Sequence, residues 1–286
     1  MIPRVADDSR PSMQRTAGIG RFSVKRSGGR TRLATLYQEG AAKIRMPRVH
    51  AGEILEAVLI NTAGGLTGGD RLSWQVDLEK GTAVVLTTPT CEKIYRSSGG
   101  HAEVETRVRV GDEACFAYLP QETLVFEGSA LNRRLDVDLA GSASALFVES
   151  AIFGRQAMGE TVRRACFADQ WRIRQDGRLI HADNLRFDGD VDALLHARAG
   201  TNGRIAIATV LMVHAGVEGL VDGIRADLGE DGGASVWRIA GRDKLVVRIV
   251  AESGFALRKK LLPVLLRCNK NLLGSPSYGL PKVWNL

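Results

Sequence analysis

The feature that most constrains the fold of this chain is a series of short segments in which apolar and polar residues alternate. The clearest is residues 101–110, HAEVETRVRV, and the same period of two returns in residues 134–139, RLDVDL. Such a period gives a β-strand one dry face and one wet face. Residues 171–183 carry it on both sides of Asp176-Gly177, which predicts a hairpin. Because no helical period separates these segments, we expect a mainly β fold of stacked sheets.

The last third of the sequence has a different pattern, and we expect a small α+β segment near residues 205–273. A predicted strand is followed there by an amphipathic helix at 217–228 and by a hairpin around Gly241. Residues 255–274 then predict a terminal helix, and Pro263 is expected to start or kink it.

Composition places the chain among soluble globular proteins, because 44% of its residues are hydrophobic and 25% are charged. The sequence holds no apolar run near the ~20 residues that span a bilayer. Residues 1–20 carry aspartates and prolines where a secretory signal would be apolar. We expect a cytoplasmic protein with a flexible basic N-terminus at 1–18 and a single β-rich domain at 19–286.

Positive charge is concentrated at the beginning of the chain. The net charge is +7, and residues 1–48 hold eleven Lys/Arg against three Asp/Glu, so the remainder is close to neutral. A nucleic-acid-binding protein could carry such an arm, but no aromatic stacking motif accompanies it. The favoured interpretation is a solvated, charged first strand whose use is the attraction of an acidic partner.

Residues 61–72, NTAGGLTGGDRL, place four glycines within twelve positions. A phosphate-binding P-loop would need lysine where Asp70 stands and a helix after it, but residues 71–78 alternate like a strand. The Rossmann GxGxxG pattern and a tandem calcium repeat are also missing. The glycines instead predict a sharp turn between two buried strands, through positive φ angles and close backbone approach: Gly64, Gly65, Gly68 and Gly69.

Three further motifs follow this stretch: LTTPTCEKIYRS at 86–97, LPQETLVFEGSALN at 119–132 and FGRQAMGE at 153–160. The chain ends with LPKVWNL at 280–286. Together these segments resemble the successive landmarks of the urease accessory protein UreD family, called UreH in some species. The resemblance runs from about Arg21 to the C-terminus, and four motifs in order make it far more specific than one glycine run.

The resemblance implies a scaffold for loading nickel into apo-urease, and not an enzyme. Members of the family bind UreF, which recruits the GTPase UreG, and the three dock together on urease. The implied fold is an irregular β-helix-like stack of sheets with a few helices. The implied assembly is hetero-oligomeric, with a dimer of heterotrimers as one form, and involves neither nucleic acid nor a membrane. No cofactor is tightly bound, and Ni²⁺ is held only in transit.

A carrier must release nickel, so scattered carboxylates suit it better than a closed Cys/His cage. The five histidines form no HxH or HxxxH pair. The family is proposed to hold an acid-lined internal tunnel, and we expect the acids among its candidates to converge on one cavity. Each candidate also has a structural alternative, a turn hydrogen bond or a salt bridge such as that of Glu160 with Arg155 or Arg163. The candidates for the nickel path are Asp70, Glu149, Glu160, His181 and Asp183.

Partner binding is assigned to the second motif and to the C-terminal tail. The motif offers Lys93, Tyr95 and Arg96, since Tyr and Arg are preferred interface anchors. The tail carries Tyr278 and Trp284, and it is either packed on its own body or donated to a partner. On the second alternative, removing residues 281–286 should weaken UreF binding while the β body stays folded.

Two other classes of protein stay open. One is a β-rich hydrolase that uses Asp70 and Glu149 as paired acids, although the chain lacks a GxSxG elbow. The other is a nucleic-acid-binding protein that works through the basic residues 1–48.

Overall fold

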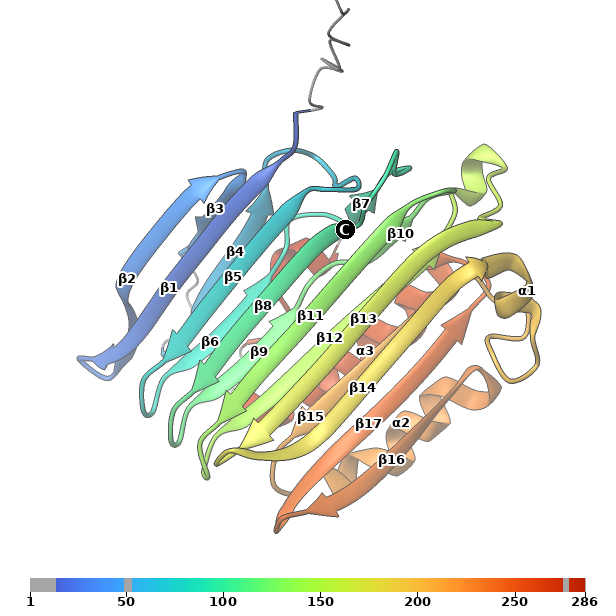
Figure 1. The fold of residues 1–286 in the computed structure, drawn as a ribbon. Coiled ribbons are helices and arrows are strands. Elements are labelled where there is room, and N and C mark those ends of the chain that lie inside the picture. Colours follow the sequence, from blue (N-terminus) through green and yellow to red (C-terminus); the bar gives the residue numbers. More distant parts are fainter. Residues whose placement is uncertain (1–13, 49–52, 275–277, 286) are drawn as a thin grey trace, which may run out of the picture.

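A computed structural model of the chain describes residues 14–48, 53–274 and 278–285. Most of the predicted flexible N-terminus, 1–18, therefore lies outside the described residues. In the described part, the strands form two stacked sheets of seven and ten strands, with a few helices added (Figure 1). The expected mainly β, solenoid-like stack of sheets is confirmed.

The central part of the chain winds as a solenoid, because consecutive long strands alternate between the two sheets. The ten-stranded sheet receives β4 (Leu55–Asn61), β6 (Ala83–Thr87), β9 (Cys115–Leu119) and β12 (Ser144–Phe153). The seven-stranded sheet receives β5 (Arg71–Leu78), β8 (Ala102–Val110), β11 (Ala130–Leu139) and β13 (Arg164–Gln175). Neighbours within each series pair in parallel, since each coil of the chain lays its strand beside the equivalent strand of the coil before it.

The remaining strands complete the edges of the sheets. The seven-stranded sheet adds β1 (Ala17–Ser27), β2 (Arg30–Gly40) and β14 (Arg178–Asp190). Its spatial order is β14-β13-β11-β8-β5-β1-β2. The ten-stranded sheet adds β3 (Ala42–Arg45), β7 (Glu92–Ile94), β10 (Thr123–Val125), β15 (Ala206–Val213), β16 (Gly232–Ile239) and β17 (Arg242–Ala251). Its main path is β16-β17-β15-β12-β9-β6-β4-β3, and β10 joins β7 to β12.

Both predicted hairpins are present. β13 and β14 pair antiparallel around Asp176 and Gly177, whose φ angles of 48° and 77° are left-handed. β16 and β17 pair antiparallel around Ala240 and Gly241, which have φ angles of 53° and 78°. Positive φ at both turn residues matches the right-handed twist of a tight hairpin.

The two helices expected in the last third are present, and a short helix that was not predicted precedes them. α1 (Val191–His196) follows β14, and α2 (Val221–Leu228) follows the 3₁₀ turn η2 (Val217–Leu220). α3 (Gly254–Leu273) begins after Ser253, whose hydroxyl accepts the N–H of Ala256 as an N-cap. Pro263 lies inside α3, so the expectation that it starts the helix is wrong, and a kink at this residue stays a prediction. Three short 3₁₀ turns complete the set: η1 (Gln156–Met158), η3 (Gly229–Asp231) and η4 (Lys282–Asn285).

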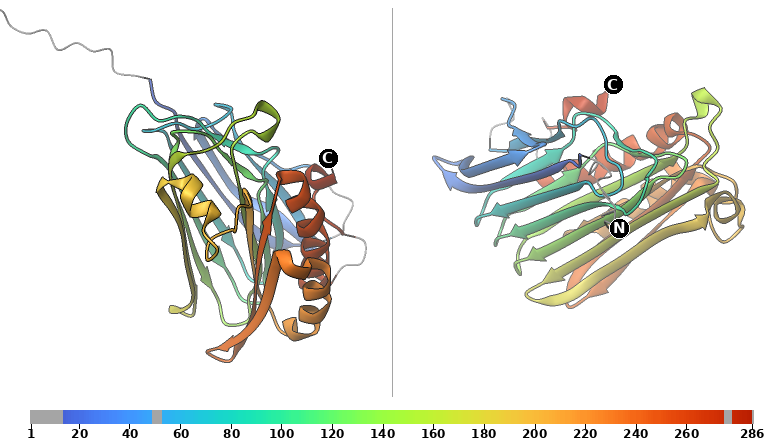
Figure 2. Two further views of the ribbon diagram at one scale, coloured as in Figure 1. Left: turned by 90° about the vertical axis from the view of Figure 1, so that its right-hand side faces the viewer. Right: turned by 45° about the horizontal axis from the view of Figure 1, so that its top comes forward.

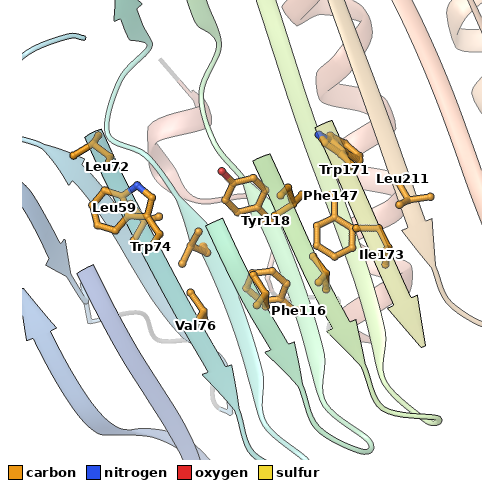
Figure 3. Packing of buried hydrophobic residues seen from close by; sticks show 14 of the residues in the cluster. Leu59, Leu72, Trp74, Val76, Phe116, Tyr118, Phe147, Trp171, Ile173 and Leu211 are labelled. Carbon is orange, nitrogen blue, oxygen red and sulfur yellow. The ribbon is translucent and has the colours of Figure 1, made fainter. Parts of the chain in front are cut away.

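Hydrophobic side chains form two cores, one on each face of the ten-stranded sheet. Between the sheets, Phe116, Phe147 and Ile173 pack together with side chains from both layers (Figure 3). On the other face, α2 and α3 cover the ten-stranded sheet, as the edge-on view in Figure 2 shows. α3 contributes a stripe spaced for one helix face: Leu257, Leu261, Val264, Leu265, Cys268 and Leu272.

The C-terminal tail packs on its own chain. Trp284 is fully buried, and its indole N–H donates to the carbonyl oxygen of Leu119 at 3.1 Å. Tyr278 is buried as well and donates its hydroxyl to Glu56 at 2.9 Å. Of the two alternatives, a tail packed on its own body is the one seen for these two side chains, because the body encloses both. A direct contact of either one with a partner stays a prediction.

Candidate functional site

The four motifs that are separated in the sequence meet at one end of the solenoid. We call this surface the motif end, made of residues 61–70, 91–100, 120–129 and 153–163. Leu66 forms a β-bridge with Ile94, and β7 lies parallel to β10. The N–H of Gly154 donates to the carbonyl oxygen of Val125 at 2.8 Å. The winding of the chain explains the meeting, because each motif occupies the same turn of a successive coil.

The glycine stretch is built as predicted, with two different uses of glycine. Gly64, Gly65 and Gly69 have positive φ angles of 76°, 156° and 92°. Gly68 serves close approach instead, since a Cβ there would lie 2.0 Å from Ser97 Oγ and 2.4 Å from the carbonyl oxygen of Gly99. The stretch therefore holds the turns of neighbouring coils together.

Asp70 has a local structural role. Its Oδ1 accepts the N–H of Thr16 at 2.7 Å, and its Oδ2 accepts the N–H of Thr67 at 2.8 Å. The residue is buried and does not line the cavity described next. The expectation that Asp70 shares a cavity with the other acids is therefore wrong, and the turn hydrogen bonds are the alternative that holds.

A cavity of about 170 Å³ lies between the sheets beneath the motif end. Exposed Gly64, Thr90 and Lys93 line one part of it, and buried Glu149 and largely buried Arg133 line the deeper part. Its walls include Leu59, Leu72, Trp74 and Tyr118, which Figure 3 shows between the two sheets. The volume accommodates several water molecules. The cavity thus leads from the family motifs into the interior of the stack.

Glu92 lines this cavity near its exposed part. Burial raises the pKa of its carboxyl group to about 7, although the Asn61 amide donates to both carboxylate oxygens at 3.2 and 3.3 Å. Neighbouring Cys91 donates its thiol to Glu122 at 3.4 Å, and burial raises the pKa of that thiol to about 11. The cavity therefore offers carboxylate oxygen and a protonated thiol near neutral pH.

Three buried charges meet at the deep end of the cavity, and we call Arg133, Glu149 and Asp169 the interior triad. Arg133 Nε and Nη2 donate to the two oxygens of Asp169 at 3.2 and 3.0 Å. Arg133 Nη1 lies 2.7 Å from Glu149 Oε2, yet that oxygen forms no hydrogen bond among the described residues. Burial raises the pKa of Glu149, and the Arg133 charge opposes the shift. Glu149 is thus a buried, paired carboxylate with one oxygen left unbonded.

A row of polar side chains continues beyond the triad, and we call Glu149, Thr209, Arg248 and Asp183 the interior polar row; it reaches the surface at Arg248, whose side chain is 48% exposed. Thr209 lies directly opposite Glu149 on β15, and Arg248 lies opposite Thr209 on β17. Arg248 donates to Thr209 and to Asp183, which projects from the seven-stranded sheet. A second, smaller cavity of about 10 Å³ has Arg133, Glu149, Asp169 and Thr209 in its lining. Asp183 therefore belongs to the same row as Glu149, one arginine further along, but outside both cavities.

His181 and Asp183 point to one face, as predicted, because Ile173 and Trp171 oppose them in the hairpin and are both buried inward. They have separate partners. Lys244 Nζ lies 3.4 Å from His181 Nδ1, whereas Asp183 pairs with Arg248. Burial, reinforced by the Lys244 charge, lowers the pKa of His181 to about 4. The imidazole is neutral near pH 7, and a shared metal at His181 and Asp183 gains no support from this geometry.

The other candidates lie at the motif end. Glu160 pairs with Arg155, with its Oε2 2.8 Å from Nε, so the salt-bridge alternative holds for this residue. Lys93, Tyr95 and Arg96 are exposed, and Tyr95 packs edge-on against Phe126 at 5.4 Å between ring centroids. These three side chains are accessible to a partner, and their use as a binding site stays a prediction.

Three residues of the site were not among the sequence candidates. Arg133 and Asp169 occupy inward positions of strands whose other inward residues, such as Leu135 and Trp171, are apolar. A charged residue in phase with an apolar face is a signal that the alternation itself contains. Glu92 carries no such signal, because it stands in a short polar segment and its burial comes from the neighbouring coils.

The described residues contain no group of three His, Cys, Asp or Glu side chains placed to hold a metal ion. Two carboxylates of the triad share one arginine instead. No helix in residues 14–48, 53–274 or 278–285 has both the length and the apolarity that a bilayer crossing requires. What the interior offers is a polar row with charges in alternating sign.

Comparison with known proteins gives a consistent relationship. A family profile described as UreD urease accessory protein matches residues 17–285. The chain is 50% identical over 275 residues to urease accessory protein UreD 1 of Brucella abortus, which covers 96% of each chain. It is 47% identical over 278 residues to urease accessory protein UreD of Mesorhizobium japonicum, with 97% of each chain covered. With the motifs gathered at one end and matched along nearly its whole length, the chain belongs to the UreD family of urease accessory proteins.

Proposed function

We propose that this chain is the nickel-passing scaffold of urease maturation in the cytoplasm. It binds UreF, holds the GTPase UreG through UreF, and docks on apo-urease, while Ni²⁺ passes through its interior. Membership of the UreD family supports the part in urease maturation. The observation that carries the nickel path is the cavity of about 170 Å³ that links the motif end to Glu149.

The donor set of this cavity suits passage better than storage. Ni²⁺ accepts carboxylate oxygens, and Glu92 and Glu149 both line the cavity. Each carboxylate already has a partner, the Asn61 amide in one case and the Arg133 guanidinium in the other. A cation must compete with these partners at every step, so its contacts stay weak and reversible. The path we propose runs from Glu92 to Glu149 and along the interior polar row toward Asp183.

The two alternatives have less support. A hydrolase with Asp70 and Glu149 as paired acids needs both in one cavity, but both oxygens of Asp70 accept backbone N–H groups elsewhere. A nucleic-acid-binding role would depend on the basic residues 1–48, of which 1–13 lie outside the described residues. Salt-dependent binding to DNA or RNA would revive that role.

The test is Glu149→Gln, expressed together with the urease subunits and accessory proteins. The substitution keeps the shape of the side chain and leaves Arg133 paired with Asp169, so we expect a folded chain that still binds UreF. Urease matured with it should contain less nickel per active site and be correspondingly less active. The matched control is Glu160→Gln, which removes an acid of a family motif outside the cavity. Fully nickel-loaded urease from Glu149→Gln would refute the path.

A further inference from the structure

Arg133 stands at the boundary between the two interior cavities. Both cavities have Arg133 and Glu149 in their lining, and the smaller one adds Asp169 and Thr209. The guanidinium of Arg133 therefore borders both cavities on the proposed path from the motif end toward Asp183.

The contacts of Arg133 differ in their hydrogen bonding, and this difference decides which contact a cation can replace. Asp169 lies directly opposite Arg133 on the neighbouring strand and holds the guanidinium through two hydrogen bonds. Thr123 accepts a third hydrogen bond from Nη1 at 2.9 Å. Glu149 approaches from the other sheet at 2.7 Å, but its buried Oε2 forms no hydrogen bond with any residue that the structure describes. Asp169 thus anchors the arginine, and the contact with Glu149 is the one that a competitor can replace.

We propose that Arg133 is the counter-cation of Glu149, which Ni²⁺ must displace in order to bind this carboxylate. This competition lowers the affinity of the path for Ni²⁺, so the metal is not retained. This inference rests on the proposed nickel path and names the residue that sets its affinity. With Arg133 in place, the interior triad has two acidic groups and one fixed positive charge. Without it, two carboxylates face a cavity of low dielectric constant, which is an environment that retains a divalent cation.

The geometry also explains why an arginine suits this position. A guanidinium stays protonated when buried. Its Nε and Nη2 groups can remain hydrogen-bonded to Asp169 while the contact of Nη1 with Glu149 is broken. A lysine would offer one point charge and could not keep Asp169 through paired hydrogen bonds while releasing Glu149. The positive charge of Arg133 therefore remains beside the path while the cation passes. Its repulsion weakens the binding of the cation, so the cation is released.

The decisive variant is Arg133→Gln in the full-length chain, with Ni²⁺ affinity measured at pH 7 by competition with a chromophoric chelator. We expect binding at least about tenfold tighter than in the wild-type chain, and slower release to excess chelator, because the competing charge is gone. The double variant Arg133→Gln/Glu149→Gln removes one charge of each sign, so its affinity should return to near the wild-type value. Arg155→Gln, which removes an arginine from a motif-end pair with Glu160, should change nothing.

Wild-type affinity in a folded Arg133→Gln chain would overturn the proposal. If that variant does not fold without metal, thermal unfolding with and without Ni²⁺ decides in its place. Recovery of a cooperative transition with Ni²⁺, and no recovery in the double variant, would support the counter-cation role. Failure of Ni²⁺ to recover the fold would overturn it. These measurements use no urease, so they are independent of the Glu149→Gln maturation assay on which the nickel path itself depends.

Discussion

Trp284 donates its indole N–H to the carbonyl oxygen of Leu119 at 3.1 Å, and this bond fixes the end of the chain to strand β9 of the ten-stranded sheet. The ring also lies under the guanidinium of Arg258, 5.3 Å from its carbon atom. Arg258 in turn pairs with buried Glu122, next to the cavity residue Gln121. Through Arg258, the tail therefore stabilises the segment around Gln121 and Glu122, which forms part of the cavity wall.

We expect Trp284→Ala to lower the free energy of unfolding by about 3–5 kcal/mol, because it empties a fully buried site and removes one of the hydrogen bonds to the carbonyl oxygen of Leu119, which keeps that from the Thr87 hydroxyl. Urea unfolding followed by circular dichroism measures the change. The matched control is Trp237→Ala on the edge strand β16, where the side chain is 58% exposed and the change should stay within about 0.5 kcal/mol.

The same packing revises the expected effect of removing residues 281–286. The body should lose stability as well as any partner contact, since the truncation removes Trp284 from the helix-covered core. Equal urea midpoints for the truncated and intact chains would contradict this account and restore the tail as a pure partner segment.

Asp70 gives a second prediction, which distinguishes a structural role of this residue from a role in nickel transport. Asp70→Ala removes both acceptors of the Thr16 and Thr67 N–H groups, so we expect a loss of about 1–3 kcal/mol in stability. Asp70→Asn keeps one acceptor oxygen and should lose less. Urease matured with either variant, if that variant folds, should have a normal nickel content, because the Asp70 carboxylate does not line the cavity. Nickel-poor urease from a stable Asp70→Asn chain would contradict the assignment.

The sequence predicted the strands well, but it could not predict how they wind. Alternation in residues 101–110 defines a wet and a dry face, and both faces are found in β8. The same alternation is compatible with antiparallel hairpins and with the parallel coils that the structure has. Pairing depends on contacts between residues far apart in the chain, which no local period encodes.

The candidate site was predicted in part for the same reason. Glu149 was found because a carboxylate interrupts an apolar strand. Its partner Arg133, and Asp169, which pairs with Arg133, come from the facing sheet, so their role depends on how the two layers are stacked. Asp70 was misassigned because a turn and a channel both call for an acid beside glycine, and only the hydrogen bonds distinguish them.

Glu92 gives a prediction for the pH dependence of stability. Burial raises the pKa of this carboxyl group from 4.5 to about 7, so the folded chain binds more protons than the unfolded chain between these values. The contribution of Glu92 to stability is therefore complete below about pH 4.5 and is lost as the pH rises through 7. Glu92→Gln cannot ionise, so its stability should fall less over this window, by about 1–3 kcal/mol relative to wild type. Urea unfolding at pH 5 and pH 7.5 measures the difference, and parallel curves for the two chains would show that Glu92 does not titrate with a raised pKa.

The last prediction concerns the exposed side chains of the motif end. Lys93 lines the exposed part of the cavity, and the exposed side chains of Tyr95 and Arg96 follow it in the same motif, Tyr95 with 43% of its surface exposed. If a partner such as UreF docks here through acidic side chains, Lys93→Glu/Arg96→Glu should weaken its binding at least about tenfold at low ionic strength, and less at high salt, because like charges then face each other. Arg109→Glu is the matched control, since Arg109 is an exposed arginine near the far end of β8. Titration of the purified partner at two salt concentrations measures the effect.

Wild-type affinity in the double variant, or an equal loss in Arg109→Glu, would move the partner site away from the motif end. A loss confined to the double variant would put the docked partner over the mouth of the cavity, where nickel could pass from one protein to the other without entering bulk water.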